Sequence, residues 1–340
     1  FGPEERLAFL FYDDAYYYLG VARHLAAAAG STFDGINPTN GYHPLWCWLL
    51  VPVFLFVDNP DLAVRAAAMR WFLLAAAVPW AIWWALRRRT GPVGSVTAAA
   101  LFALHPFVAL GLARPNGLET PLYALLIALF VGVYERMVGR GERRWPPLLL
   151  LGMLLGLVIL ARMDGGLLAV AAAVLLVVHG WRSGGARVAA TRLAALVLGA
   201  VVIAGPSLGW NVLRFGHPMP VSGRMVSLGA ERERAELGGP LSLGNARRRI
   251  GYGLEKIPLR FASTVVENTA LARPLWKSGK AGGTLLLLAT AAMLAVALRQ
   301  RRRRGALSSD AFALLLLFGV LHYGAYVSWL WTGGEERYRL

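Results

Sequence analysis

The sequence predicts an all-α, polytopic membrane protein, and three observations lead to that fold class. Of the 340 residues, 57% are hydrophobic and only 16% are charged, and the mean hydropathy is +0.51. Several apolar runs are long enough to cross the roughly 30 Å hydrocarbon core of a bilayer as helices. Basic residues gather in clusters beside these runs. Together these features exclude a soluble domain and predict a bundle of transmembrane helices.

Eight apolar runs are long enough, or nearly long enough, to span a membrane. A ninth run, residues 45–57, has thirteen residues with Pro52 in its middle, so as a helix it would reach only about 20 Å. We therefore expect this short run to lie along the membrane interface. The eight predicted spans are residues 62–86, 96–112, 118–134, 146–160, 165–178, 193–213, 284–298 and 311–331.

Clusters of basic residues orient the predicted spans. If the run 45–57 lies along the interface, all of these clusters fall on one side of the membrane, which the positive-inside rule identifies as cytoplasmic. The net charge of +16 then reflects anchoring on anionic lipid and calls for no nucleic acid. Fifteen of the 35 basic residues lie in four clusters, at residues 87–89, 136–144, 182–192 and 299–304. The opposite, outer face is predicted to hold residues 13–59, 116–119, 162–164, 214–283 and 333–340.

The domain organisation follows from the absence of repeats and linkers. Residues 1–340 are predicted to form a single membrane domain. Within it, residues 11–60 form a first outer loop with juxtamembrane helices, and residues 214–283 form an outer loop or lid. No signal peptide or long apolar run precedes the first outer loop, so we expect a first transmembrane helix upstream of residue 1 and a further segment after Leu340.

The pair Asp13-Asp14 is the first candidate for chemistry, because carboxylates are costly in a membrane protein and call for a reason. It precedes residues 15–29, which have helical composition and end at Gly30, a good helix stop. The helix dipole favours ionised carboxylates there, so one acid could merely cap the helix. Two adjacent acids rarely both cap, and the second carboxylate would be free to accept a proton or hold a divalent cation.

Further polar motifs follow the acidic pair in a definite order. A Gly-Tyr-His-Pro-Leu segment, residues 41–45, closes the first outer loop. Later motifs are Arg-Pro-Asn-Gly-Leu-Glu-Thr-Pro at residues 114–121, Ala-Arg-Met-Asp-Gly at 161–165, an Asn-to-Pro segment at 211–220 and Glu-Glu-Arg-Tyr at 335–338. This order resembles the GT-C glycosyltransferases, particularly bacterial relatives of the protein mannosyltransferases, aminoarabinose transferases and mycobacterial arabinofuranosyltransferases. The resemblance implies a hexosyl- or pentosyltransferase that moves a sugar from a polyprenyl phosphate carrier to an acceptor at the outer leaflet.

The resemblance also implies roles for individual residues. Asp13 matches the catalytic aspartate, which would deprotonate the acceptor hydroxyl in an inverting displacement, with Asp14 assisting. Glu119 matches the second acid of the superfold. The leaving polyprenyl phosphate gains negative charge, and each donor that stabilises this charge is worth ~3 kcal/mol. The candidates for binding phosphate or substrate are Arg114, Arg162, Arg214, Arg337, Tyr338, His43 and Asn40.

Each candidate also has a simpler explanation. An arginine at the edge of a span is more often a snorkelling anchor than a ligand. Arg162 lies in a tight turn with Asp164, so the two could form an internal ion pair, and Glu119 could pair with Arg114 in the same way. A histidine before a proline, as His43 is, is more often a plain hydrogen-bonding residue.

No cofactor is expected to be required, since the second loop lacks a clear Asp-x-Asp. A divalent cation is the alternative, held by Asp13, Asp14 and Glu119. The expected partners are a polyprenyl-phosphate sugar, a glycan, lipid or protein acceptor, and the bilayer. The predicted location is the bacterial cytoplasmic membrane, with the active site facing outside.

A lipid or solute transporter, or a flippase without transferase activity, is the competing class. Transporters commonly carry key charges near the midplane on broken helices, often in repeated halves. Here the acids lie in predicted outer loops and no repeat is visible. The sequence therefore favours the glycosyltransferase.

Overall fold

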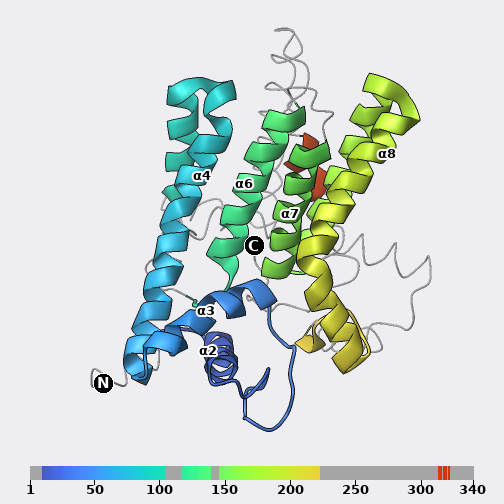
Figure 1. The fold of residues 1–340 in the computed structure, drawn as a ribbon. Helices are drawn as coiled ribbons and strands as arrows, with labels where there is room; N and C mark the ends of the chain where they lie inside the picture. The colour runs from blue at the N-terminus through green and yellow to red at the C-terminus, as the bar shows by residue number, and fades with distance from the viewer. Residues whose placement is uncertain are drawn as a thin grey trace, which may run out of the picture. The chain divides into compact units, whose positions relative to one another are not determined.

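The computed structural model describes residues 10–104, 116–138, 145–222, 313–315, 317–319 and 321. Within these ranges the chain is helical, with one isolated β-bridge and no strand (Figure 1). The predicted all-α membrane fold is confirmed. The chain divides into two compact units, Phe1–Arg224 with Asp310–Phe318 and Met225–Ser309 with Gly319–Leu340. All elements named below belong to the first unit, and the predicted single domain stays a prediction.

Helix α4 (Pro60–Ala103) contains two helical arms joined at a kink. At a rise of 1.5 Å per residue its 44 residues would extend about 66 Å, twice the thickness of a hydrocarbon core. The break falls at Gly91, where φ is 72° and ψ is −179°, a conformation open to glycine because it lacks a Cβ. The predicted spans 62–86 and 96–112 therefore meet in a turn beside the first basic cluster, and the described part of the second span ends at residue 104.

Helix α8 (Gly165–Phe215) is a second pair of arms, residues 165–183 and 186–215. They separate at Gly184 and Gly185, and Gly185 has a φ of 72°. The arms fold back on each other so closely that a Cβ on Gly180 would lie 2.6 Å from the Cα of Ala189. Both arms are longer than the predicted spans, because the helix continues through much of the basic cluster at 182–192.

Helices α6 (Thr120–Val138) and α7 (Trp145–Ala161) complete the described bundle. Glycines let α7 and the second arm of α8 approach at backbone distance, since a Cβ on Gly199 would lie 2.1 Å from the carbonyl oxygen of Leu149. Small residues commonly bring membrane helices this close. Among the described helices, three segments are long and apolar enough to span by themselves, namely Pro60–Arg88, Thr120–Met137 and Gly165–Phe215.

Two shorter helices, α2 (Asp13–Ala26) and α3 (Pro44–Phe56), lie together at one end of the bundle (Figure 1). Helix α3 matches the thirteen-residue run predicted to be interfacial, with proline at its first position. Helix α2 ends earlier than the predicted segment 15–29, because Ala28 adopts a left-handed φ of 56° before Gly30. The turns of α4 and α8 lie at the opposite end of the bundle from α2 and α3 (Figure 1), in agreement with the predicted separation of basic clusters from outer loops.

Candidate active site

Glu119, just before α6, is the centre of a buried polar cluster. The residue is only 3% exposed. Its Oε1 accepts a hydrogen bond from Nη1 of Arg162 at 2.9 Å, and its Oε2 accepts one from the hydroxyl of Tyr18 at 3.2 Å. The Nε2 atom of His43 lies 3.6 Å from Oε1. The cluster therefore joins α2, the start of α3, the start of α6 and the turn between α7 and α8.

Arg162 binds a second carboxylate in the same cluster. Its Nε donates to Oδ1 of Asp164 at 3.1 Å, so the predicted internal ion pair of these two residues is present. Glu119 pairs with Arg162, and the alternative partner Arg114 lies outside the described residues. One guanidinium thus holds two carboxylates, which gives the three groups a formal excess of one negative charge.

Two neutral side chains complete the cluster. Burial lowers the pKa of His43, against the opposing effect of the nearby Glu119 carboxylate. Its Nδ1 is buried and has no hydrogen-bond partner among the described residues. Burial, together with the charge of Glu119, raises the pKa of Tyr18 well above its usual value. At neutral pH the cluster therefore holds an uncharged imidazole and a protonated phenol, whose O–H donates a hydrogen bond to Glu119.

Asp13 and Asp14 lie in the first turn of α2, and both are exposed. Neither occupies the N-cap position, which belongs to Tyr12 without a side-chain bond. Oδ1 of Asp13 accepts the backbone N–H of Asp14 at 3.0 Å. Neither acid is therefore the N-cap residue of α2, although one carboxylate oxygen of Asp13 satisfies a backbone donor of the first turn.

The start of α2 packs directly on the loop that leads to Glu119. A Cβ on Gly117 would lie 2.6 Å from Cβ of Ala15 and 2.7 Å from the ring of Phe11, and Gly117 has a φ of +71°. Only glycine allows both the contact and the left-handed backbone at low cost. Asp14 precedes Tyr18 by one helical turn and so shares its side of α2, whereas Asp13 projects at about 100° from Asp14. The two acids therefore differ in the side of α2 that they occupy, a difference that depends on the helix and its packing.

Asn40 ties the first outer loop to the end of α8. It is 3% exposed, as is Asn211. Nδ2 of Asn40 donates to Oδ1 of Asn211 at 3.1 Å, and Oδ1 of Asn40 accepts the backbone N–H of Val221 at 3.0 Å. Asn211 is not among the predicted site residues, although an amide within an apolar run is a signal, since a buried amide needs hydrogen bonds.

The remaining predicted phosphate and substrate ligands are not among the described members of the Glu119 cluster. Arg214 is exposed in the last turn of α8 and forms no ion pair with any described residue. Arg337 and Tyr338 lie outside the described residues, as do Arg114 and residues 223–283 of the predicted lid. Within the described part of the chain, no three His, Cys, Asp or Glu side chains are grouped so that they could hold a metal ion. Metal independence stays a prediction.

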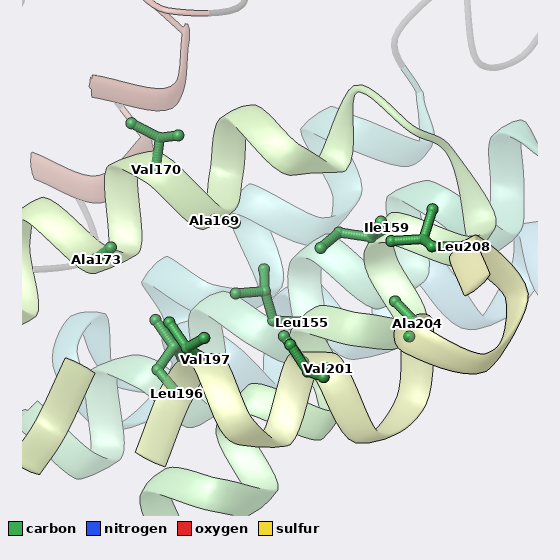
Figure 2. Close-up of a pocket in the computed structure, with 12 residues that line it drawn as sticks. Leu155, Ile159, Ala169, Val170, Ala173, Leu196, Val197, Val201, Ala204 and Leu208 are labelled. Atoms are coloured by element: carbon green, nitrogen blue, oxygen red, sulfur yellow. The ribbon is translucent and has the colours of Figure 1, made fainter. Parts of the chain in front are cut away.

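An apolar groove of about 310 Å³ lies between α7 and the two arms of α8. Figure 2 shows side chains from all three helical segments around it, for example Leu155 on α7, Val170 on the first arm and Val201 on the second. All of its described lining residues are apolar. Such a groove can accept an acyl or isoprenoid chain but offers no partner for a polar group.

Comparison with known families decides the class of protein. Residues 40–210, half of the chain, match the dolichyl-phosphate-mannose-protein mannosyltransferase family. The chain belongs to this family. The GT-C resemblance is thereby confirmed, and the protein is a membrane glycosyltransferase that acts on a lipid-linked sugar. The matched range contains Glu119 and Arg162 and begins after Asp13 and Asp14. Neither a curated protein nor a solved structure matches the chain.

Proposed function

We propose that the protein transfers a sugar from a polyprenyl-phosphate donor to an acceptor, with inversion, at the outer face of the bacterial cytoplasmic membrane. The family supports the lipid-linked donor. The observation that carries the proposal further is the packing of Phe11 and Ala15 against Gly117. This contact sets the exposed acids at the start of α2 beside the loop that holds the buried Glu119.

Asp13 is the proposed general base. Its exposed carboxylate takes the proton of the acceptor hydroxyl as the hydroxyl oxygen attacks the anomeric carbon of the donor sugar. The bond from that carbon to the phosphate oxygen breaks, and polyprenyl phosphate leaves with the electron pair. Asp14, on the same side of α2 as Tyr18, orients the acceptor. A positioned general base of this kind typically contributes about 10²- to 10⁴-fold in rate.

In this proposal the Glu119–Arg162 pair stabilises the loop next to the exposed acids and has a structural role. Because Arg162 already binds two carboxylates, we assign it to holding Glu119 in place, with any phosphate contact secondary. Arg214 is the better phosphate ligand among the described residues, since its exposed guanidinium has no acidic partner there. Arg114, Arg337 and Tyr338 remain proposed phosphate ligands from the rest of the chain.

The apolar groove between α7 and α8 is suited to part of the polyprenyl chain, because every described lining residue is apolar. His43, neutral at pH 7, and Asn40 contribute hydrogen bonds to substrate. No cofactor is required in this scheme, with a divalent cation held by Asp13, Asp14 and Glu119 as the alternative.

Turnover in proteoliposomes tests the proposal. The full-length protein and its Asp13→Asn variant are compared on a panel of polyprenyl-phosphate sugars by release of polyprenyl phosphate. Asp61→Asn is a matched control, because Asp61 is an exposed acid in the first turn of α4. We expect Asp13→Asn to lower kcat by at least about 10²-fold and Asp61→Asn to leave it unchanged. Full turnover in Asp13→Asn would refute the assignment of Asp13 as the base. Absence of wild-type turnover on every carrier would favour the competing transporter or flippase function.

A further inference from the structure

A second hollow, which we name the Trp48–Trp210 pocket, lies between the first outer loop and the end of α8. Its volume is about 450 Å³, within the range of small-molecule sites. Segments far apart in sequence form it, and the buried bond between Asn40 and Asn211 ties them together. Its lining includes Asn40, Tyr42, Trp48, Ser207, Trp210 and Asn211.

Two tryptophans give the pocket flat apolar faces. Trp48 and Trp210 are 45% and 39% exposed, so each indole keeps uncovered surface where it lines the pocket. Trp210 is held in place by an edge-on contact with Phe215, with ring centroids 5.2 Å apart. Partly exposed indoles suit a ligand whose own surface has apolar faces.

Polar groups lie among these aromatic faces. Ser207 is 7% exposed and contributes a hydroxyl group to the lining of the pocket. Each Nδ2 of Asn40 and Asn211 carries two N–H groups and donates one hydrogen bond to a described residue, to Asn211 and Pro218 respectively. The pocket therefore presents donors and acceptors that the fold has already fixed in orientation.

The pocket carries no formal charge on its described lining residues. Tyr42 stays protonated, because burial raises its pKa to about 12, and its hydroxyl is hydrogen-bonded to Ser31. A phosphate would lack a cation here, and an ammonium group would lack an acid. The matching ligand is neutral, with apolar C–H faces for the indoles and hydroxyl groups for the amides and serine. A sugar ring has this combination.

The pocket adjoins the polar cluster of Glu119. Tyr42 and Pro44 line the pocket, whereas His43 between them reaches Glu119. A sugar bound in the pocket is therefore separated from the cluster by the single segment 42–44. The donor brings a phosphate, which the neutral pocket cannot match, so the acceptor is the better occupant.

We propose that the Trp48–Trp210 pocket binds a neutral sugar ring of a glycan acceptor. This inference rests on the proposed function and narrows the acceptor from a glycan, lipid or protein to a glycan. The pocket is an acceptor-positioning site, distinct from the acids that carry the chemistry.

Binding without donor tests the inference independently of catalysis. The full-length protein in nanodiscs is titrated with a panel of neutral hexose and pentose oligosaccharides and followed by saturation-transfer NMR. We expect Trp210→Ala to weaken binding at least tenfold and Trp210→Phe to weaken it less. Trp80→Ala is the matched control, because Trp80 is 58% exposed on α4 and does not line the pocket. Ser207→Ala, a small change that preserves packing, is expected to weaken binding about 2- to 10-fold, as for loss of one hydrogen bond.

Kinetics of the same variants separate the two proposals. Trp210→Ala should raise the KM for the acceptor at least tenfold and leave the KM for the donor unchanged. Any of three results would overturn the inference: a rise in the donor KM alone, unaltered binding in both Trp210→Ala and Ser207→Ala, or failure of wild type to bind any oligosaccharide. Oligosaccharide binding that depends on Trp210, without any turnover, would leave the pocket assignment standing and reject the transferase proposal.

Discussion

Replacing Arg162 with glutamine should destabilise the protein much more than replacing Glu119, because the two changes leave different charges behind. Arg162→Gln leaves Glu119 and Asp164 without their shared cation, and Glu119 is only 3% exposed. Removing one partner of a buried ion pair costs about 3–5 kcal/mol. Glu119→Gln instead leaves Arg162 paired with Asp164 at 3.1 Å and keeps an amide of the same shape, so its expected cost is about 1.5 kcal/mol.

The double variant Arg162→Gln/Glu119→Gln tests the same ion pair. In the Arg162→Gln background, Glu119→Gln removes an uncompensated buried carboxylate, so the double variant should be more stable than Arg162→Gln alone by about 1–2 kcal/mol. The free energy of unfolding is measured in mixed micelles by titration with a denaturing detergent, followed by circular dichroism. Arg214→Gln, at an exposed position, is the control and should lie within about 0.5 kcal/mol of wild type. Equal costs for the two single variants, or costs that simply add in the double variant, would refute the shared-cation account.

Two further predictions concern stability. Because burial lowers the folded-state pKa of His43 below its ordinary value of 6.5, the unfolded chain binds the proton first on acidification. The stability that His43 contributes is present above pH 6.5 and is lost as the pH falls through the folded-state pKa. The melting temperature should therefore decrease below pH 6.5, and His43→Gln should make this decrease smaller. The same dependence of melting temperature on pH in His43→Gln and wild type would contradict a buried neutral imidazole. Alanine substitution at two glycines of α8 should change the free energy of unfolding in opposite directions. Gly199→Ala, whose Cβ would meet a backbone oxygen at 2.1 Å, should destabilise the protein by about 1–3 kcal/mol or more. Gly209→Ala, whose Cβ would have no atom within 4 Å, should stabilise it by up to about 1 kcal/mol. Equal melting temperatures for the two variants would count against the close contact of α7 and α8.

Parts of the fold were predictable because their causes are local. Span length is set by bilayer thickness and side-chain hydropathy, and both can be obtained from consecutive residues. The predicted run 146–160 therefore differs from α7 by one residue at each end. The end of α2 was placed less well, because Ala28, with no turn signature, adopts a left-handed backbone before Gly30. The full length of the α8 arms was not predicted, because the charged residues of the cluster 182–192 interrupt the apolar pattern and so resemble the end of a span.

By itself, the sequence determined the class of membrane protein, the acids at the start of a helix and the order of motifs that identified the superfold. Only the tertiary structure decided which polar side chains meet: Arg162 reaches Glu119 across 43 residues, Tyr18 reaches Glu119 across 101, and Asn40 reaches Asn211 across 171. Hydropathy and helix propensity act over a few neighbouring residues, so a single sequence can place a span. Pairing of buried polar groups depends on which helix ends the packing brings together, and that is decided by contacts such as Gly117 against α2 and the glycines between α7 and α8.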